Sequence, residues 1–190
     1  VRIGEDRIEV DDRSVPAESI THLRWGATRI QRNGGCVDEL YRISLGGPGW
    51  SPMDIEFGSP GIARGIACMV KGQTMPNVAD LFARLLDALL HRVVPGVVRR
   101  LMARLEREGS VAIGACQIDR IGIRFETGML LWKREWRILW DRAHIDCREG
   151  SIIVRDRSNP GCSVSLSMQE TWNAVLIPFI HSILTQRAES

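Results

Sequence analysis

Lysine is nearly absent from this chain of 190 residues. Only Lys71 and Lys133 occur, so arginine supplies the other 23 of the 25 basic residues. Guanidinium groups bind oxyanions bidentately, but the arginines are scattered along the whole chain, which favours a compositional bias over a phosphate- or carboxylate-binding surface. The net charge is only +2 and the pI about 8.4, so no nucleic-acid partner is expected from charge.

Long uncharged apolar runs are also missing. The most apolar stretch, residues 81–98, is interrupted by Arg84, Asp87 and Arg92, so it falls short of the roughly 18 residues that a membrane-spanning helix requires. The first twelve residues are charged and strand-like, unlike a signal peptide. A cytoplasmic location with reduced thiols is therefore expected for the five widely spaced cysteines, Cys36, Cys68, Cys116, Cys147 and Cys162.

The chain lacks the short motifs of common catalytic and cofactor sites. Neither the Gly-x-Ser-x-Gly elbow nor the Gly-x-x-x-x-Gly-Lys and Gly-x-Gly-x-x-Gly phosphate loops occur. The four histidines are dispersed, and a structural role is expected for each. We therefore expect no enzyme, no catalytic residue and no cofactor. The histidines are His22, His91, His144 and His181.

A metal site is not expected either. His144 and Cys147 have a His-x-x-Cys spacing, but a zinc site usually requires two such pairs. Alternation along a strand would also place these two side chains on opposite faces.

What is present is, first, a β-rich N-terminal third. Alternation at period two predicts strands at residues 40–45 and 53–57, and Asn33-Gly34 predicts a hairpin turn before them. Residues 58–76 are rich in Gly and Pro without a clear period, which predicts a long loop.

A long amphipathic helix is predicted at residues 77–108. Asn77 is a typical N-cap residue, and apolar residues recur at helical spacing as far as Leu105. Pro95 removes one backbone hydrogen bond, so we expect either a kink or two abutting helices. Gly109 is expected to end the helix.

Strands return after Ser110 and give way to a second helix. Alternating segments predict several strands, with turns at Glu149-Gly150 and at residues 158–161. Ser167 and Glu170 have the spacing of a capping box, which predicts that the C-terminal helix begins there. Pro178 would then lie inside that helix and kink it.

The two halves share one order of features: a charged hairpin, alternating strands and an amphipathic helix. This order predicts a duplication, with one module at residues 1–108 and the other at residues 109–190. A strongly bent antiparallel sheet leaves an open end that such a helix can close.

Three segments carry a resemblance to a known superfold: Ile138-Leu139-Trp140-Asp141, Gly150-Ser151-Ile152-Ile153-Val154 and Thr171-Trp172-Asn173-Ala174-Val175-Leu176. They resemble two strands and the start of the closing helix in pleckstrin-homology-like (PH-like) domains, in particular bacterial tandem modules of unknown function. Residues 110–187 match best, because the Gly-rich region 46–76 is longer than such a module needs. The resemblance implies an α+β fold of two bent antiparallel sheets or barrels, each followed by an amphipathic helix. It also implies a binding or assembly role without catalytic residues.

The first candidate binding surface mixes aromatic and cationic side chains within residues 132–137. Indole rings and cations together suit an anionic membrane interface, and they are also common anchors in protein interfaces. Simple alternation would instead turn the indoles towards the core and the cations towards water. The candidate residues are Trp132, Lys133, Arg134, Trp136 and Arg137.

The second candidate surface is the apolar stripe in the later part of the long helix. It is expected to pack between the two modules or against a second copy of the chain. Arg100, Arg104 and Arg107 share another face of this helix, where a solvated surface is expected and RNA or phosphoinositide binding is the alternative. The stripe consists of Val97, Val98, Leu101, Met102 and Leu105.

Together these features predict a non-enzymatic binding or adaptor module of the bacterial cytoplasm that acts through a protein partner, self-association or assembly. The alternative is a peripheral module that binds an anionic lipid surface through residues 132–137. An enzyme with residues assembled from distant strands is the third hypothesis.

Overall fold

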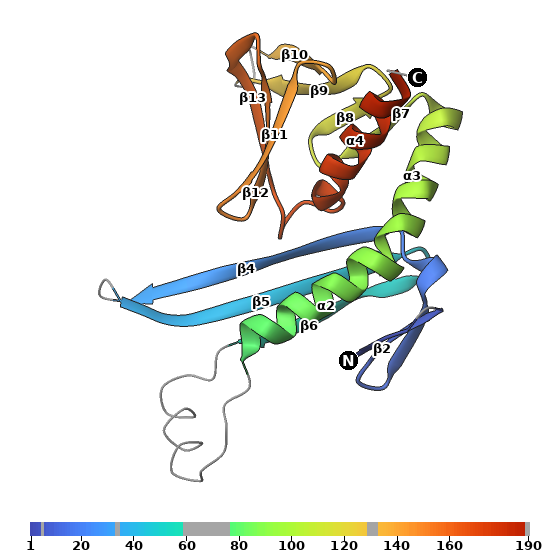
Figure 1. Cartoon of the computed structure of the whole chain (residues 1–190), viewed down its shortest axis with the longest axis vertical. Coiled ribbons are helices and arrows are strands. Elements are labelled where there is room, and N and C mark those ends of the chain that lie inside the picture. The colour runs from blue at the N-terminus through green and yellow to red at the C-terminus, as the bar shows by residue number, and fades with distance from the viewer. Residues whose placement is uncertain (5, 33–34, 59–76, 129–132, 189–190) are drawn as a thin grey trace.

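The computed structural model describes residues 1–4, 6–32, 35–58, 77–128 and 133–188 (Figure 1). Within these ranges the fold is mixed α+β, with four antiparallel sheets and three α-helices. The predicted α+β class is confirmed. None of the four sheets closes into a barrel within the described ranges, so the expected barrel form is not seen there.

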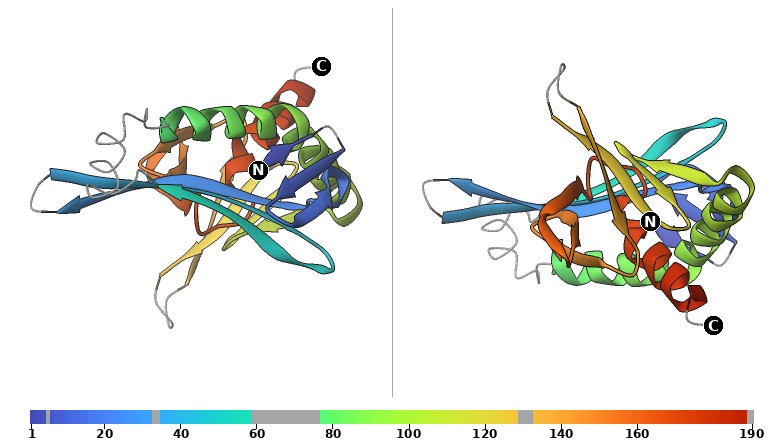
Figure 2. Two further views of the ribbon diagram at one scale, coloured as in Figure 1. Left: turned by 90° about the horizontal axis from the view of Figure 1, so that it is seen from below. Right: turned by 90° about the horizontal axis from the view of Figure 1, so that it is seen from above.

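The first half contains two three-stranded meanders. In the short first sheet, Asp11 has a positive φ of 53° in the turn between β2 and β3. The second sheet is longer, and the far ends of its first two strands extend away from the helices (Figure 2). The strands are β1 (Arg2–Ile3), β2 (Arg7–Val10) and β3 (Arg13–Pro16) in the first sheet, and β4 (His22–Arg32), β5 (Gly35–Gly47) and β6 (Trp50–Gly58) in the second; the short 3-10 helix η1 (Ala17–Ser19) links the two sheets.

The predicted strands at residues 40–45 and 53–57 lie within β5 and β6 and are confirmed. In β5, Ile43 and Leu45 are buried. Strands β4 and β5 pair down to Arg32 opposite Gly35, whereas the predicted Asn33-Gly34 turn lies outside the described residues. Of the loop predicted at residues 58–76, Gly58 is the last residue of β6, and residues 59–76 lie outside the described residues.

The predicted long helix is divided into two abutting helices, which is one of the two forms expected from Pro95. Helix α2 (Val78–Arg92) ends one residue before Val93, and α3 (Val94–Glu108) begins directly after it. Pro95 lies in the first turn of α3, where a backbone N–H would have no acceptor within that helix. At the start of α2, Asn77 accepts a hydrogen bond from the backbone N–H of Asp80 at 3.4 Å. Gly109 ends α3 with a left-handed φ of 78°.

The second half has a four-stranded sheet followed by a three-stranded one. The order of the first is β10-β9-β8-β7 and that of the second is β11-β12-β13. Glu149-Gly150 forms the predicted turn, with φ values of 50° and 73°, as a two-residue hairpin requires. The strands are β7 (Ser110–Ile113), β8 (Cys116–Asp119), β9 (Gly122–Thr127), β10 (Arg134–Leu139), β11 (Ala143–Arg148), β12 (Ser151–Asp156) and β13 (Asn159–Ser167).

The turn predicted at residues 158–161 lies earlier in the chain. The chain turns at residues 157–158, and β13 already begins at Asn159. Asp156 sets this position, because its Oδ1 accepts hydrogen bonds from both the backbone N–H and the hydroxyl of Ser158, at 2.8 and 2.6 Å. Such an Asx-type turn needs neither Pro160 nor the glycine after it.

The predicted start of the C-terminal helix is wrong. Ser167 does accept the expected hydrogen bond from the N–H of Glu170, at 3.2 Å, but it caps only a turn. Asn173 then adopts a left-handed φ of 65°, which interrupts any helix. The 3-10 helix η2 (Ala174–Leu176) follows, and α4 (Ile177–Ala188) begins only at Ile177. Pro178 therefore lies in the first turn of α4 and does not kink it.

One hydrophobic cluster runs through both halves, from Ile3 to Ile180. Helix α3 connects the halves, and α4 lies beside it (Figure 1). Hydrogen bonds also join segments that are far apart in sequence. For example, the backbone N–H of Leu23 donates to Oδ1 of Asn173 at 2.9 Å. No helix in the described part of the chain is long and apolar enough to cross a membrane.

Candidate functional site: a groove between α3 and α4

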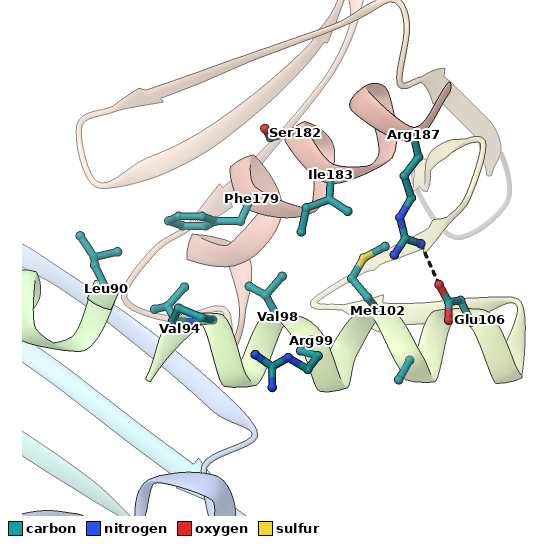
Figure 3. Close-up of a pocket in the computed structure, with 12 residues that line it drawn as sticks. Leu90, Val94, Val98, Arg99, Met102, Glu106, Phe179, Ser182, Ile183 and Arg187 are labelled. Atoms are coloured by element: carbon teal, nitrogen blue, oxygen red, sulfur yellow. Dashed lines mark hydrogen bonds and ion pairs between the residues drawn. The ribbon is translucent and has the colours of Figure 1, made fainter. Parts of the chain in front are cut away.

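An apolar groove lies between α3 and α4, with a cavity volume of about 530 Å³. Helical spacing places Val94, Val98 and Met102 on the face of α3 that meets α4 (Figure 3). Phe179 and Ile183 project from α4 into the same space (Figure 3). Two helices that are far apart in sequence thus build one site.

The groove combines a buried floor with an exposed ring. Val94, Val98 and Met102 are almost fully covered by the rest of the chain. Phe179 is 38% exposed, and it is the one aromatic residue among the exposed large hydrophobic side chains of the described residues. An aromatic ring that remains in water beside an apolar floor is typical of a binding surface.

Charged residues mark the rim of the groove. At one end Arg187 donates to Glu106 at 2.7 Å, and this hydrogen bond holds the pKa of Glu106 below its usual value (Figure 3). Arg99 is exposed on α3, and the structure gives it no ion pair within the described ranges. The rim therefore carries one cation in excess.

The predicted helix surface is divided between interior and groove. Val97, Val98, Met102 and Leu105 are buried inside the chain, and Leu101 is half-buried. Val98 and Met102 line the groove towards α4, whereas Val97 and Leu101 line a second cavity on another side of α3. The stripe thus packs between elements of its own chain, and two of its members also line the floor of the groove.

The predicted aromatic and cationic surface lies at the start of β10, and Trp132 falls outside the described residues. The three cations have partners within the chain. Lys133 pairs with Glu126 at 2.7 Å, and Arg137 pairs with Asp119 at 2.7 Å. The guanidinium of Arg134 stacks 4.0 Å above the ring of Trp136.

These contacts are those expected of a strand with one solvent-exposed face and one face packed against the core. The half-buried Trp136 packs against the core and donates its indole N–H to the hydroxyl of Thr127 at 2.9 Å, while Trp140 is buried. Arg134 and Arg137 are exposed. Because carboxylates neutralise two of the three cations, this surface presents less positive charge than its sequence indicates.

Asp119 is a structural centre that the sequence reasoning missed. Its Oδ1 accepts hydrogen bonds from the N–H groups of Ile121 and Gly122, both at 2.9 Å. Its Oδ2 holds Arg137, and its backbone carbonyl accepts the indole N–H of Trp140 at 2.9 Å. The Asp-x-x-Gly spacing at residues 119–122 is typical of an Asx-type turn and is the signal that could have indicated this role.

The second cavity, of about 470 Å³, lies where β4, α3 and the turn before η2 meet. His22, Arg100, Arg104 and Trp172 line it. His22 was expected to be dispersed and structural, and the sequence gives no signal that it lies near Arg104, since the two are far apart along the chain.

The cysteines and histidines build no metal centre in the part of the chain that the structure describes. Cys116 and Cys162 are buried, and Cys147 is exposed. Burial raises the pKa of the Cys116 thiol to about 11, so this thiol is not an activated nucleophile. The side chain of Cys36 and the whole of Cys68 lie outside the described residues.

Two concave sites thus lie among the described residues, the groove between α3 and α4 and the second cavity beside His22. Neither family models, nor curated proteins, nor solved structures match this chain.

Proposed function

We propose that this chain is a non-enzymatic binding module that holds an amphipathic helix of a partner protein in the groove between α3 and α4. The observation that carries the proposal is the exposed ring of Phe179 beside a floor of buried aliphatic side chains. Aromatic side chains are common anchors in protein interfaces, where the partner covers them.

The shape of the groove supports a helical occupant. Two packed helices leave a channel between them, and an amphipathic helix can lay its apolar stripe in such a channel. The partner segment should therefore carry apolar residues at i, i+3 or i+4, and i+7.

The rim charges set the second feature of the partner. Glu106 and Arg187 already pair with each other, so the exposed Arg99 is the cation left to meet an incoming group. A carboxylate on the partner helix would complement it and would favour one orientation of binding.

We infer further that the two halves are versions of one PH-like module. The first half runs through three strands, three strands and the abutting helices α2 and α3, and the second runs through four strands, three strands and α4. This shared order supports a duplication with its boundary near residue 108, where α3 ends. The free thiols of Cys116, Cys147 and Cys162 fit the reducing cytoplasm that we propose as its location.

Quantitative affinity capture from the native lysate tests the proposal. The wild-type chain should retain a partner in stoichiometric amount, and Phe179→Ser should reduce its retention at least about tenfold, because it removes an anchor of about 2 kcal/mol or more. Arg99→Glu should reduce retention less. Leu81→Ser is the matched control, because Leu81 is 46% exposed but lies on α2 outside the groove.

Equal capture by wild type and Phe179→Ser would contradict the groove as the contact. A liposome assay with phosphatidylserine vesicles covers the lipid alternative. Binding of the wild-type chain that is lost on the double change Lys133→Glu, Arg134→Glu would place the contact on β10 and would overturn the proposal.

A further inference from the structure

We propose that the second cavity, between β4, α3 and the turn before η2, is a binding site for a small organic oxyanion, with Arg104 and His22 as its polar contacts and Trp172 as its flat apolar wall. The inference is independent of the partner groove, which lies between α3 and α4.

The polar contacts come from two elements. His22 begins β4, and its Nδ1 lies 2.8 Å from the hydroxyl of Thr21. Its Nε2 has no hydrogen-bond partner among the described residues. Arg104 donates from Nε to Glu108 at 2.7 Å, while its two Nη groups have no hydrogen bond within the described part of the chain. One imidazole nitrogen and one guanidinium edge thus remain to meet a ligand.

The electrostatics favour an anion. None of the described residues that line the cavity carries a carboxylate, whereas His22, Arg100 and Arg104 all lie there. The pKa of His22 is lowered by burial first and by the charge of Arg104 second. Burial also lowers the pKa of Arg100, although Glu18 opposes this. Glu108 pairs with Arg104 and Glu18 acts on Arg100, but neither carboxylate lines the cavity, so an anion that enters it meets two guanidinium groups.

The apolar wall favours an organic ligand over a bare ion. The ring of Trp172 meets the edge of the His22 ring, with centroids 6.0 Å apart, and the guanidinium of Arg24 lies 4.3 Å above it. These contacts hold the indole plane in position. Val97 and Leu101 of α3 also line the cavity, whose volume of about 470 Å³ is enough for a ring-sized ligand.

Either a phosphate or a carboxylate group satisfies this chemistry, because guanidinium binds both bidentately. Phenyl phosphate and benzoate are therefore the two probes. They share a ring for Trp172 and differ in the oxyanion, so the probe that binds more tightly identifies the class of the natural ligand.

Histidine ring signals in NMR spectra of the full chain give the direct readout. His22 is assigned by comparison with His22→Gln. At millimolar concentration at least one probe should shift the His22 signal and raise the pH midpoint of its titration, because a bound anion favours the imidazolium. Arg104→Gln should weaken binding about tenfold or more, as expected for loss of a charge-assisted hydrogen bond.

Arg84→Gln is the matched control, because Arg84 is an exposed arginine of α2 that lines neither the groove nor the second cavity. It should leave probe binding unchanged. The inference is overturned if neither probe moves the His22 signal of the wild-type chain, or if Arg104→Gln binds as tightly as the control. Since the first readout needs no variant beyond the assignment, a variant that folds poorly does not prevent the test.

Discussion

At the scale of single residues, Asn173 joins the two halves through three hydrogen bonds. Its Oδ1 accepts from the N–H of Leu23 at 2.9 Å, and its own N–H donates to the carbonyl of Leu23 at 2.8 Å. Its Nδ2 donates to the carbonyl of Thr21 at 3.2 Å. Asparagine also tolerates the left-handed backbone at this position better than most residues.

Asn173→Ala should destabilise the protein by about 3 kcal/mol. It leaves the buried N–H of Leu23 unpaired, which costs about 1–3 kcal/mol, and it places alanine at a left-handed φ, which costs about 1–2 kcal/mol. Urea unfolding measures the change. Asn173→Gly should avoid the cost of the left-handed backbone but not that of the unpaired N–H. Equal stability of the glycine and alanine variants would therefore contradict this account.

His22 should titrate below the ordinary histidine pKa of about 6.5. On acidification the unfolded chain then takes up a proton at this residue before the folded chain does, so the free energy of unfolding should fall as pH drops through 6.5 towards the lower folded pKa. NMR titration gives the midpoint. Arg104→Gln should raise it only in part, because burial is the larger cause.

At the scale of elements, α3 adjoins three other parts of the chain. One side meets α4 across the groove, another lines the second cavity, and its end leads directly into β7. Gly109 allows this direct connection to β7, because its left-handed φ of 78° lets the chain leave the helix and enter the strand.

Alanine substitutions at two glycines of this segment should change the free energy of unfolding in opposite directions. In Gly109→Ala a new Cβ would meet nothing within 4 Å, so the expected loss of about 1 kcal/mol comes from the backbone alone. Gly96→Ala lies inside α3, where the new Cβ makes ordinary contact with Arg100, and should stabilise the protein by about 0.5–1 kcal/mol. Thermal and urea unfolding measure both changes in stability. If both variants were more stable than the wild type, or both less stable, the assignment of the helix end would be contradicted.

Elements with local signals could be predicted from the sequence. The N-cap Asn77, the division near Pro95 and the stop at Gly109 each depend on chemistry within a few residues, and each was predicted. The start of α4 could not be predicted in this way. Ser167 and Glu170 give a local signal for a helix, but the tertiary bonds of Asn173 to β4 hold the chain in another conformation.

At the scale of the whole molecule, one hydrophobic cluster spans both predicted modules. The groove and the second cavity both lie where segments from different parts of the chain meet, so no local pattern could reveal them. What the sequence did provide was the stripe on α3 and the apolar face of α4. Which of these residues face water depends on packing across the molecule.

The full chain should unfold in one cooperative transition. Core contacts, the Asn173 bonds to Leu23 and the ion pair between Glu106 and Arg187 all link the two halves. Tryptophan fluorescence and far-UV circular dichroism should therefore give the same urea midpoint. Two separated midpoints would show that the halves unfold independently.

The groove itself is tested most directly by site-specific photo-crosslinking. A photoreactive residue in place of Ser182, which is exposed on α4 at the groove, should capture the partner through an amphipathic segment. The same residue in place of the exposed Ser158, in the turn before β13, should capture nothing comparable. Crosslinking from Ser182 that disappears with Phe179→Ser is the result this account predicts. Equal crosslinking from both positions, or from Ser182 regardless of Phe179, would contradict it.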